Sequence, residues 1–509
     1  MKPGPCTTRS VARHRRPRRR VMYITQVGAE CAPVAKVGGL GDVIHGLSRE
    51  LAKQGNEVEV ILPKYDCLRL DLIEDRRRVC EDLQVPFYDQ WLPCRVESGT
   101  VDGIHCFFID PDSDHGFYRR GHIYGEVDDP GRFAFFSRAV LEFLLKTDRQ
   151  PDIIHCHDWH TSLLSVLRWE VHEALGLSRP RICHTLHNPV YQGIAGEYLL
   201  RAVGLAPARL MTRERLRDQG NPHAVNLLQG AIVYANSVTT VSPRHAWEVL
   251  HTDQGLGLQE ALHTHGHKLQ GVLNGIDEDT WNPRTDPQIV RNYGPESLPG
   301  KARNKQQLRR RLGLEEAAKP LVAIISRLDR QKGVELMRHA IHYALGNGCQ
   351  MVLLGSTSEP WIEELFRDIA RRYEASGDCH LALRYDEELS HQIHAGADIL
   401  VIPSLYEPCG LTQMTAMKYG VVPVVRRVGG LADSVFDANY SDKAFEEVNG
   451  FLFDDPTPEG LESALGRAIR LWFEHPEYFR QLRLNGMHTD NSWARPAQRY
   501  LDIFEAIKA

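Results

Sequence analysis

The stretch Ile399–Asp433 constrains the fold more than any other part of the chain, because strand-like and helix-like segments alternate within it. An apolar, β-branched run at 399–402 is long enough for a buried strand. Good helix formers at 411–419 stop at Gly420, a residue suited to a helix C-cap. A second apolar run follows at 421–425. The pattern predicts two parallel strands joined by a loop and a helix.

The loop of this unit holds the first candidate for chemistry. It contains one carboxylate, Glu407, followed by Gly410, which lets another backbone or a ligand approach closely. Ligands of open α/β sheets bind at such strand ends, and free amides at a helix N-terminus favour phosphate. The alternative is an ordinary turn with a solvated Glu407, and the spacing alone leaves both interpretations open.

Both halves of the chain repeat this alternation, which predicts two separate sheets. In the first half, strands are predicted at 21–27, 58–62, 104–109, 151–157, 181–186 and 238–241, and helices at 42–53 and 132–146. In the second half, strands are predicted at 321–326, 351–354 and 381–385, and helices at 334–345, 361–375, 387–397 and 496–507. The expected fold class is α/β, with two Rossmann-like, doubly wound parallel-sheet domains facing a cleft.

We expect four regions along the chain. Residues 1–21 form a disordered basic extension, and 22–275 form the first Rossmann-like domain. Residues 276–490 form the second, and a helix within 491–509 packs back across the boundary. The Asn-Gly turn signal at 274–275 places the boundary between the domains.

Charge and cysteine usage exclude several classes of protein. The first twenty residues hold eight Lys or Arg and no acid. Because the formal net charge of the whole chain is −5, the remaining residues carry a net charge of −13. An acidic body argues against a nucleic-acid partner, although organelle targeting and nucleic-acid binding stay open for the basic tail. Eleven cysteines without a CxxC pair indicate reduced thiols and a cytoplasmic location. No apolar run approaches the ~20 residues of a membrane helix, so we expect no membrane partner.

A glycine-rich loop follows the first predicted strand. It reads AKVGGLGDV, with Lys36 beside Gly38, Gly39 and Gly41. The spacing is not GxGxxG, and GxxxxGK[ST] is absent, so nicotinamide binding and P-loop chemistry lose support. Lys36 either meets a phosphate or is a solvated loop lysine.

Histidines cluster where the predicted strand at 151–157 ends. His155, His157 and His160 suggest a metal, but a fourth ligand is not evident nearby, so we expect no metal site. Asp158 is better placed for a sugar or ribose contact. His187 follows the strand at 181–186 and would lie on the same sheet edge as Asp158.

Two cations in one loop complete the pattern. Arg327 and Lys332 are five residues apart, after the strand at 321–326. Such a pair suits a diphosphate, because arginine can chelate it and lysine adds a point charge. Together with Lys36 on the other domain, they predict a site for a glycosyl donor with a nucleoside diphosphate leaving group.

Seven motifs in order resemble the bacterial glycogen synthase and plant starch synthase family. They are KVGGLGDV (36–43), HCHDWH (155–160), HNPVYQG (187–193), TTVSP (239–243), LNGIDEDTWNP (273–283), SRLDRQKG (326–333) and EPCGLTQM (407–414). The resemblance runs from about Met22 to the C-terminus and is closest in wording to starch synthases III and IV. It implies a retaining GT-B glucosyltransferase that needs no metal or other cofactor. The donor would be ADP-glucose, and the acceptor the non-reducing end of an α-1,4-glucan.

The resemblance also implies roles for individual residues. Residues with a catalytic role would be Glu407, His187, Arg327 and Lys332. Residues that bind substrate would be Lys36, Gly38, Gly39, Asp42, Asp158, Asn274, Tyr385, Cys409, Gly410, Leu411 and Thr412. The first domain would take the acceptor side and the second domain the nucleotide-sugar side.

Three positions depart from the family pattern. Thr415 stands where the wider superfamily often has a second glutamate, Val428 where relatives have threonine, and Gln229 where a lysine is expected. None of these departures removes the main cations or Glu407. Two alternatives stay open: a glycosyltransferase with UDP-glucose or another acceptor, and a glucan-binding or priming protein with weak elongation activity. The sequence leaves the oligomeric state open.

Overall fold

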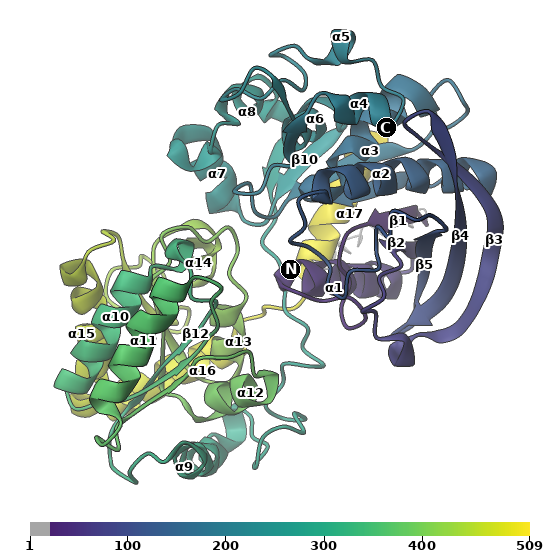
Figure 1. The fold of residues 1–509 in the computed structure, drawn as a ribbon. Helices are drawn as coiled ribbons and strands as arrows, with labels where there is room; N and C mark the ends of the chain where they lie inside the picture. Colours follow the sequence, from purple (N-terminus) through teal and green to yellow (C-terminus); the bar gives the residue numbers. More distant parts are fainter. Residues whose placement is uncertain (1–20, 509) are drawn as a thin grey trace, which may run out of the picture.

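The computed structural model describes residues 21–508, and Figure 1 shows them as two lobes, each with a sheet covered by helices. Within these residues there is a nine-stranded sheet, a six-stranded sheet and a small two-stranded sheet. The basic extension expected at 1–21 lies outside the described residues, apart from Val21. Of the described helices, none combines the length and apolar composition needed to cross a bilayer.

The nine-stranded sheet forms the N-terminal lobe, in the order β11-β10-β7-β6-β1-β2-β5-β4-β3. Its strands are β1 (Tyr23–Val27), β2 (Glu57–Pro63), β3 (Glu74–Phe87), β4 (Gln90–Val101), β5 (Ile104–Pro111), β6 (Ile153–His157), β7 (Arg181–Leu186), β10 (Ser237–Thr240) and β11 (Leu269–Gly271). The pairings are parallel, except that β4 runs antiparallel to both β3 and β5.

The β3–β4 hairpin is an addition to the predicted parallel sheet that the sequence analysis missed. Most side chains of β3 up to residue 79 are exposed, because the strand lies at the sheet edge. Its pairing with β4 also shifts register at three places. Such irregularities interrupt the period-two alternation by which strands are recognised.

The helices of the N-terminal lobe cover both faces of its sheet (Figure 1). They are α1 (Gly39–Lys53), α2 (Asp129–Lys146), α3 (Ser162–Leu167), α4 (Tyr198–Ala202), α5 (Pro207–Leu210), α6 (Leu227–Tyr234), α7 (Pro243–His251) and α8 (Gln259–Thr264), with β8 (Ile194–Gly196) and β9 (Ala224–Asn226) beside them. Helix α1 begins at Gly39, three residues before its predicted start. A Cβ on Gly41 would lie 3.3 Å from the Ala32 nitrogen, so this glycine serves close packing and not loop flexibility.

The C-terminal lobe is a parallel sheet in the order β14-β13-β12-β15-β16-β17. Its strands are β12 (Leu321–Ile325), β13 (Gln350–Leu354), β14 (Cys379–Ala382), β15 (Ile399–Ile402), β16 (Val422–Arg426) and β17 (Phe451–Phe453). Its helices are α9 (Gly300–Leu312), α10 (Val334–Gly346), α11 (Pro360–Tyr373), α12 (Glu387–Gly396), α13 (Thr412–Lys418), α14 (Gly429–Ser434), α15 (Pro458–Glu474) and α16 (Pro476–His488).

One predicted strand of this lobe is misplaced. The strand expected at 381–385 lies at Cys379–Ala382, so Tyr385 falls in the loop that leads to α12. Asp386 ends this loop, because its carboxylate accepts a hydrogen bond from the Leu389 amide and caps α12. The loop that leads to this cap therefore occupies the last positions of the predicted strand.

The final helix, α17 (Ala494–Lys508), returns to the N-terminal lobe, where it lies against α1 and β7 (Figure 1). Tyr500 and Phe504 pack on the His155 ring with centroid distances of 5.0 and 5.5 Å. The two chain segments that cross between the lobes lie side by side, because the Ile276 amide donates to the Asn491 carbonyl at 2.8 Å. The lobes are thus joined by a double crossing.

Each sheet has one point where the order of strands reverses direction. In the N-terminal sheet the reversal lies between β1 and β6, with β2 and β5 next on the side of β1 and β7, β10 and β11 next on the side of β6. In the C-terminal sheet, the corresponding neighbours are β12 and β15. Loops after such strands diverge and leave room for a ligand. Most of the predicted site residues follow these four strands, whereas His187, Asn274 and Tyr385 follow β7, β11 and β14.

Candidate active site

The strongest contact among the predicted residues lies at the β12/β15 reversal. Lys332, in the loop after β12, places its Nζ 2.8 Å from Oε1 and 2.6 Å from Oε2 of Glu407, in the loop after β15. Ser404 Oγ also donates to Glu407 Oε2 at 2.9 Å. Both charged side chains are more than four-fifths buried. The carboxylate is therefore fixed in position, and its partner is a cation suited to phosphate.

The N-terminus of α13 follows directly. Gly410 has φ +70°, and a Cβ there would meet the Gln413 side chain at 2.6 Å, so only glycine fits this turn. Leu411 precedes the helix and Thr412 is its first residue, which leaves the amides of this turn available for an anion. Cys409 is buried. Burial raises the pKa of its thiol to about 12, against the opposing effect of hydrogen bonds with Asn274.

On the facing lobe, His187 is held by a chain of side chains. The Gln26 carbonyl oxygen accepts from His157 Nε2 at 2.7 Å, and His157 Nδ1 lies 2.9 Å from His187 Nε2. With its Nε2 proton donated to Gln26, His157 accepts from His187 through Nδ1. Burial lowers the pKa of His187 to about 3, so this imidazole is neutral at physiological pH.

Asp158 lies beside His187 at the end of β6. Its Oδ1 accepts from the amides of His187 and Asn188 at 3.2 and 3.4 Å. Its φ of +58° is unusual for a residue with a side chain, and such conformations concentrate at functional sites. Burial raises the pKa of the Asp158 carboxyl to about 7, against the opposing effect of these two amides.

The histidines of this cluster contact other side chains of the protein. His155 and His157 point to one face of the strand, with ring centroids 4.1 Å apart, and His155 Nε2 lies 2.6 Å from Thr185 Oγ1. His160 stacks on Tyr124. Among the described residues, no three His, Cys, Asp or Glu side chains are arranged to hold a metal ion.

The glycine loop of the N-terminal lobe rests on Glu30, a residue that the sequence analysis missed. The Glu30 carboxylate accepts from the amides of Val37 and Gly38 at 2.6 and 2.9 Å, and the Tyr124 hydroxyl donates to it. Burial raises the pKa of Glu30. Its position between a buried strand and a glycine run was the signal in the sequence that could have identified Glu30, because exposed loop amides need an acceptor.

The glycine loop also approaches the opposite lobe. A Cβ on Gly39 would lie 3.4 Å from Leu411 Cδ1, so these two predicted residues are neighbours across the interface. Lys36 forms an ion pair with Asp42 at 2.9 Å. Burial lowers the pKa of Lys36, but attraction to Asp42, with smaller contributions from Glu387 and Tyr385, raises it overall. Lys36 is therefore positively charged and lies near α12.

Two predicted residues are less enclosed. Tyr385 is 74% exposed, and its hydroxyl donates to Glu387 at 3.1 Å. The Arg327 side chain is 59% exposed and lies 3.3 Å from Asp329. Neither contacts Glu407 directly in this structure, so both side chains are free to turn toward a ligand.

Direct hydrogen bonds join the lobes beside the site. The Glu248 carboxylate, on α7, accepts from the Gly429 amide at 3.2 and 3.0 Å, and the Arg244 amide donates to Asp433 at 2.7 Å. Helix α7 of the N-terminal lobe thus contacts α14 of the C-terminal lobe. The loops that carry the predicted residues are close enough in space to form one site.

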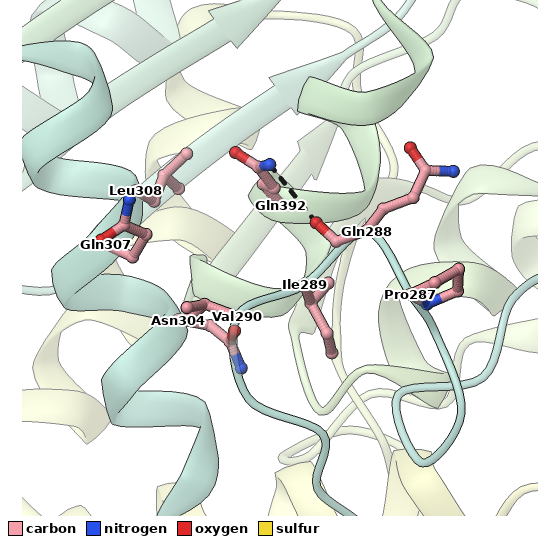
Figure 2. A pocket seen from close by; sticks show the side chains of 8 residues that line it. All are labelled: Pro287, Gln288, Ile289, Val290, Asn304, Gln307, Leu308 and Gln392. Carbon is pink, nitrogen blue, oxygen red and sulfur yellow. Dashed lines mark hydrogen bonds between the residues drawn. The ribbon is translucent and has the colours of Figure 1, made fainter.

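Figure 2 shows a different kind of pocket, of about 280 Å³, lined by residues 287–290 and by side chains of α9 and α12. Gln392 spans it with a hydrogen bond to the Gln288 carbonyl at 3.3 Å. Its lining contains amides and aliphatic groups but no charged side chain. It is therefore unsuited to a diphosphate, and none of the predicted residues lines it.

The three departures from the family pattern fall at buried positions. Gln229 donates to the carbonyls of Arg213, Arg215 and Arg217 at 3.0, 3.0 and 3.2 Å, so it holds a loop. Thr415 and Val428 are 5% and 1% exposed.

The two parallel sheets, with cations and one fixed carboxylate at facing strand ends, define a GT-B glycosyltransferase.

Comparison with known proteins identifies the family. Residues 23–264 match the model of the starch synthase catalytic domain, and residues 304–485 match the model of glycosyl transferases group 1. Glycogen synthase 1 of Nitrosococcus oceani is 55% identical over 96% of this chain and 100% of its own length. Glycogen synthase 2 of Methylococcus capsulatus is 51% identical over the same shares. The chain belongs to the glycogen synthase and starch synthase family.

Solved structures agree with this assignment. The catalytic domain of starch synthase IV from Arabidopsis thaliana, bound to ADP and acarbose, is 43% identical and has a TM-score of 0.93. The match covers 96% of this chain and 100% of that one. A sucrose-phosphate synthase from Thermosynechococcus elongatus, 18% identical with a TM-score of 0.58, shares the fold. The predicted fold class and family are confirmed.

Proposed function

We propose that this glucosyltransferase adds glucose from ADP-glucose to the non-reducing end of an α-1,4-glucan and retains the anomeric configuration. The observation that carries the proposal is the contact of Lys332 with both carboxylate oxygens of Glu407. It joins a phosphate-binding cation to a fixed carboxylate at the strand reversal where a ligand binds. ADP in the related starch synthase IV structure supports the choice of nucleotide.

The donor diphosphate is assigned to cations from both lobes. Arg327 and Lys332 would neutralise the leaving group, and Lys36 with the amides of Gly38 and Gly39 would meet it from the other side. Asp42 would keep Lys36 in place through their ion pair. The amides of Cys409, Gly410 and Leu411 and the hydroxyl of Thr412 add donors at the start of α13. The exposed Tyr385 ring would flank the adenine.

The glucosyl group is assigned to the space between Glu407 and His187. Glu407 would accept hydrogen bonds from glucose hydroxyls. His187 and Asp158 would contact the sugar from the N-terminal lobe, and Asn274 would lie near the sugar or the acceptor. Because the neutral His187 imidazole gives its Nε2 proton to His157, its Nδ1 is left to accept a hydrogen bond without adding charge near C1.

The transfer step exchanges one C1–O bond for another on the same face of the sugar. The bond from glucose C1 to the β-phosphate oxygen breaks, and its electron pair stays with ADP, next to Arg327 and Lys332. The acceptor 4-hydroxyl oxygen bonds to C1 and its proton passes to the departing phosphate oxygen. Fixed cations stabilise the charge that develops on the phosphate. Exclusion of water prevents hydrolysis of the donor, and we expect the lobes to close on it.

A cytoplasmic setting is part of this proposal. It rests on the scattered cysteines, because the ten within the described residues all have free thiols. The acidic body of the chain and the absence of a long apolar run support a glucan, and not a nucleic acid or a membrane, as the partner.

Incorporation of labelled glucose into maltooligosaccharides tests the proposal, with ADP-glucose and UDP-glucose in parallel reactions. We expect α-amylase-sensitive elongation from ADP-glucose that is lost in Glu407→Ala. Elongation from UDP-glucose but not from ADP-glucose would reject ADP-glucose as the donor. Binding to glycogen without incorporation would instead favour a glucan-binding or priming protein.

A further inference from the structure

The motif TTVSP at 239–243 has no part in the donor and acceptor assignments above, yet it lies between the two lobes. It connects the end of β10 with the start of α7. Thr240 and Ser242 of this motif, and His245 in the first turn of α7, are fully buried polar side chains. Buried polar groups are retained where they make specific hydrogen bonds, so the partners of these three indicate what the segment does.

Thr240 and His245 form a continuous hydrogen-bond chain from one lobe to the other. The Tyr406 hydroxyl lies 2.9 Å from His245 Nε2, and His245 Nδ1 lies 2.7 Å from Thr240 Oγ1. Thr240 Oγ1 in turn donates to the Leu186 carbonyl at 2.9 Å. Tyr406 immediately precedes Glu407, and Leu186 immediately precedes His187. The chain therefore connects the backbone neighbours of the two residues assigned to the sugar.

The direction of every hydrogen bond in this chain follows from its last acceptor. A carbonyl cannot donate, so the Thr240 hydroxyl proton points to Leu186, and Thr240 Oγ1 accepts from His245 Nδ1–H. In the neutral imidazole, Nε2 then carries the lone pair that accepts the Tyr406 proton. Burial lowers the pKa of His245 to about 3, which keeps the ring neutral at physiological pH. The chain has one orientation only.

Ser242 makes a second contact on the other side of Glu407. Its Oγ donates to the Pro408 carbonyl at 2.8 Å and accepts from the His245 amide at 3.1 Å. The same part of the chain thus bonds to the side-chain hydroxyl of Tyr406 and to the backbone carbonyl of Pro408. Glu407, between them, has its backbone fixed relative to the N-terminal lobe at both neighbours.

We propose that His245 is a positioning residue that sets Glu407 relative to His187 through the chain Tyr406–His245–Thr240–Leu186. The inference rests on the proposed function, because it assigns both ends of the chain to the same sugar. The contact between lobes is the site of action, and His245 itself touches neither donor nor acceptor. Displacement of a catalytic group by about 1 Å can cost about a hundredfold in rate.

Two variants break the same link of the chain by different means. His245→Asn keeps a donor near the Nδ1 position but cannot reach Tyr406, and Tyr406→Phe removes the hydroxyl and keeps the ring. We expect each to lower kcat for glucose transfer by about tenfold to a hundredfold. The KM for ADP-glucose should stay within about twofold of the wild-type value, because the cations are untouched. The double variant should be no slower than the slower single variant.

His223→Asn and Tyr478→Phe are the matched controls, because both side chains are exposed and neither belongs to the hydrogen-bond chain. They should keep wild-type kcat. A purely structural role for His245 predicts a lower Tm with an unchanged kcat per folded molecule. Unchanged kcat in either His245→Asn or Tyr406→Phe, with active wild-type protein, overturns the inference.

The imidazole tautomer gives a readout that is independent of transfer. In ¹⁵N-histidine-labelled protein, the signal absent from the His245→Gln spectrum belongs to residue 245. We expect it to show the Nδ1–H tautomer, and an Nε2–H tautomer would contradict the chain. Wild-type protein that transfers glucose from neither nucleotide sugar overturns the proposed function, whereas active wild-type protein with fully active variants overturns only this inference.

Discussion

Lys332 Nζ lies within 2.8 Å of both carboxylate oxygens of Glu407, although the two residues come from loops after different strands. The strand order of the C-terminal sheet makes this contact possible, because β12 and β15 are neighbours at the reversal. A donor diphosphate would compete with Glu407 for the lysine. We expect donor binding to draw Lys332 toward phosphate and free the carboxylate for sugar hydroxyls.

Replacement of Glu407 tests that assignment. Glu407→Ala should lower kcat by about a thousandfold, because a fixed group that acts at the reacting centre is lost. The variant should stay folded, with a Tm within a few degrees of the wild type, because only the Lys332 and Ser404 contacts are removed. Glu446→Ala, at an exposed loop position, is the control. Turnover in Glu407→Ala within tenfold of wild type would remove this residue from the mechanism.

The two arginines of the loop after β12 offer a matched pair. Arg327→Ala should raise the KM for ADP-glucose about tenfold or more, because one diphosphate cation is lost. Arg330 lies three residues away, and its guanidinium packs over the Trp361 ring at 5.4 Å. Arg330→Ala should leave the KM unchanged. Initial-rate kinetics with varied ADP-glucose measure both, and equal effects of the two substitutions would show only a general loss of positive charge.

Prediction of this fold succeeded where the periodic signal was strong. The buried strand β15 has four apolar residues and matches its predicted bounds, because a strand buried on both faces is a continuous apolar run. The β3–β4 hairpin was missed because its exposed, bulged edge lacks alternation. The predicted start of helix α1 was too late because Gly39 and Gly41 resemble loop residues, whereas Gly41 allows a close approach of backbone within the helix.

The site was predictable in its parts and not in its connections. Glu407, Lys332 and His187 follow strands, so topology rules place each at a sheet edge. Glu30 was missed because its partners, the amides of Val37 and Gly38, are backbone groups that any sequence supplies. His245 was missed because its contact with Tyr406 spans 161 positions and depends on how the lobes meet.

Asp158 should make stability depend on pH. Burial raises its pKa from the ordinary value of 3.8 to about 7, so the folded protein favours the protonated carboxyl. That contribution is complete below about pH 4 and is lost as the pH rises through 7. Between these limits the wild type should lose up to about 1.4 kcal/mol per pH unit relative to Asp158→Asn, which does not titrate.

Thermal unfolding at several pH values measures this effect. The Tm of Asp158→Asn relative to wild type should rise from pH 5 to pH 7.5. Asp442→Asn, at an exposed position, should show a constant difference over the same range. A constant difference for Asp158→Asn as well would mean that the Asp158 carboxyl titrates alike in the folded and unfolded protein.

Gly46 of α1 should tolerate no side chain, because it faces the chain that returns from the C-terminal lobe. A Cβ there would lie 2.1 Å from Nε1 of Trp493, a buried residue directly before α17. Gly46→Ala should therefore lower stability by about 1–3 kcal/mol through overpacking, despite the better helix propensity of alanine. Gly131 of α2 has open space at the same position, so Gly131→Ala should be neutral or slightly stabilising. Thermal denaturation compares the two, and a Tm for Gly46→Ala at or above the wild-type value would show that α17 does not pack against α1 as closely as the structure has it.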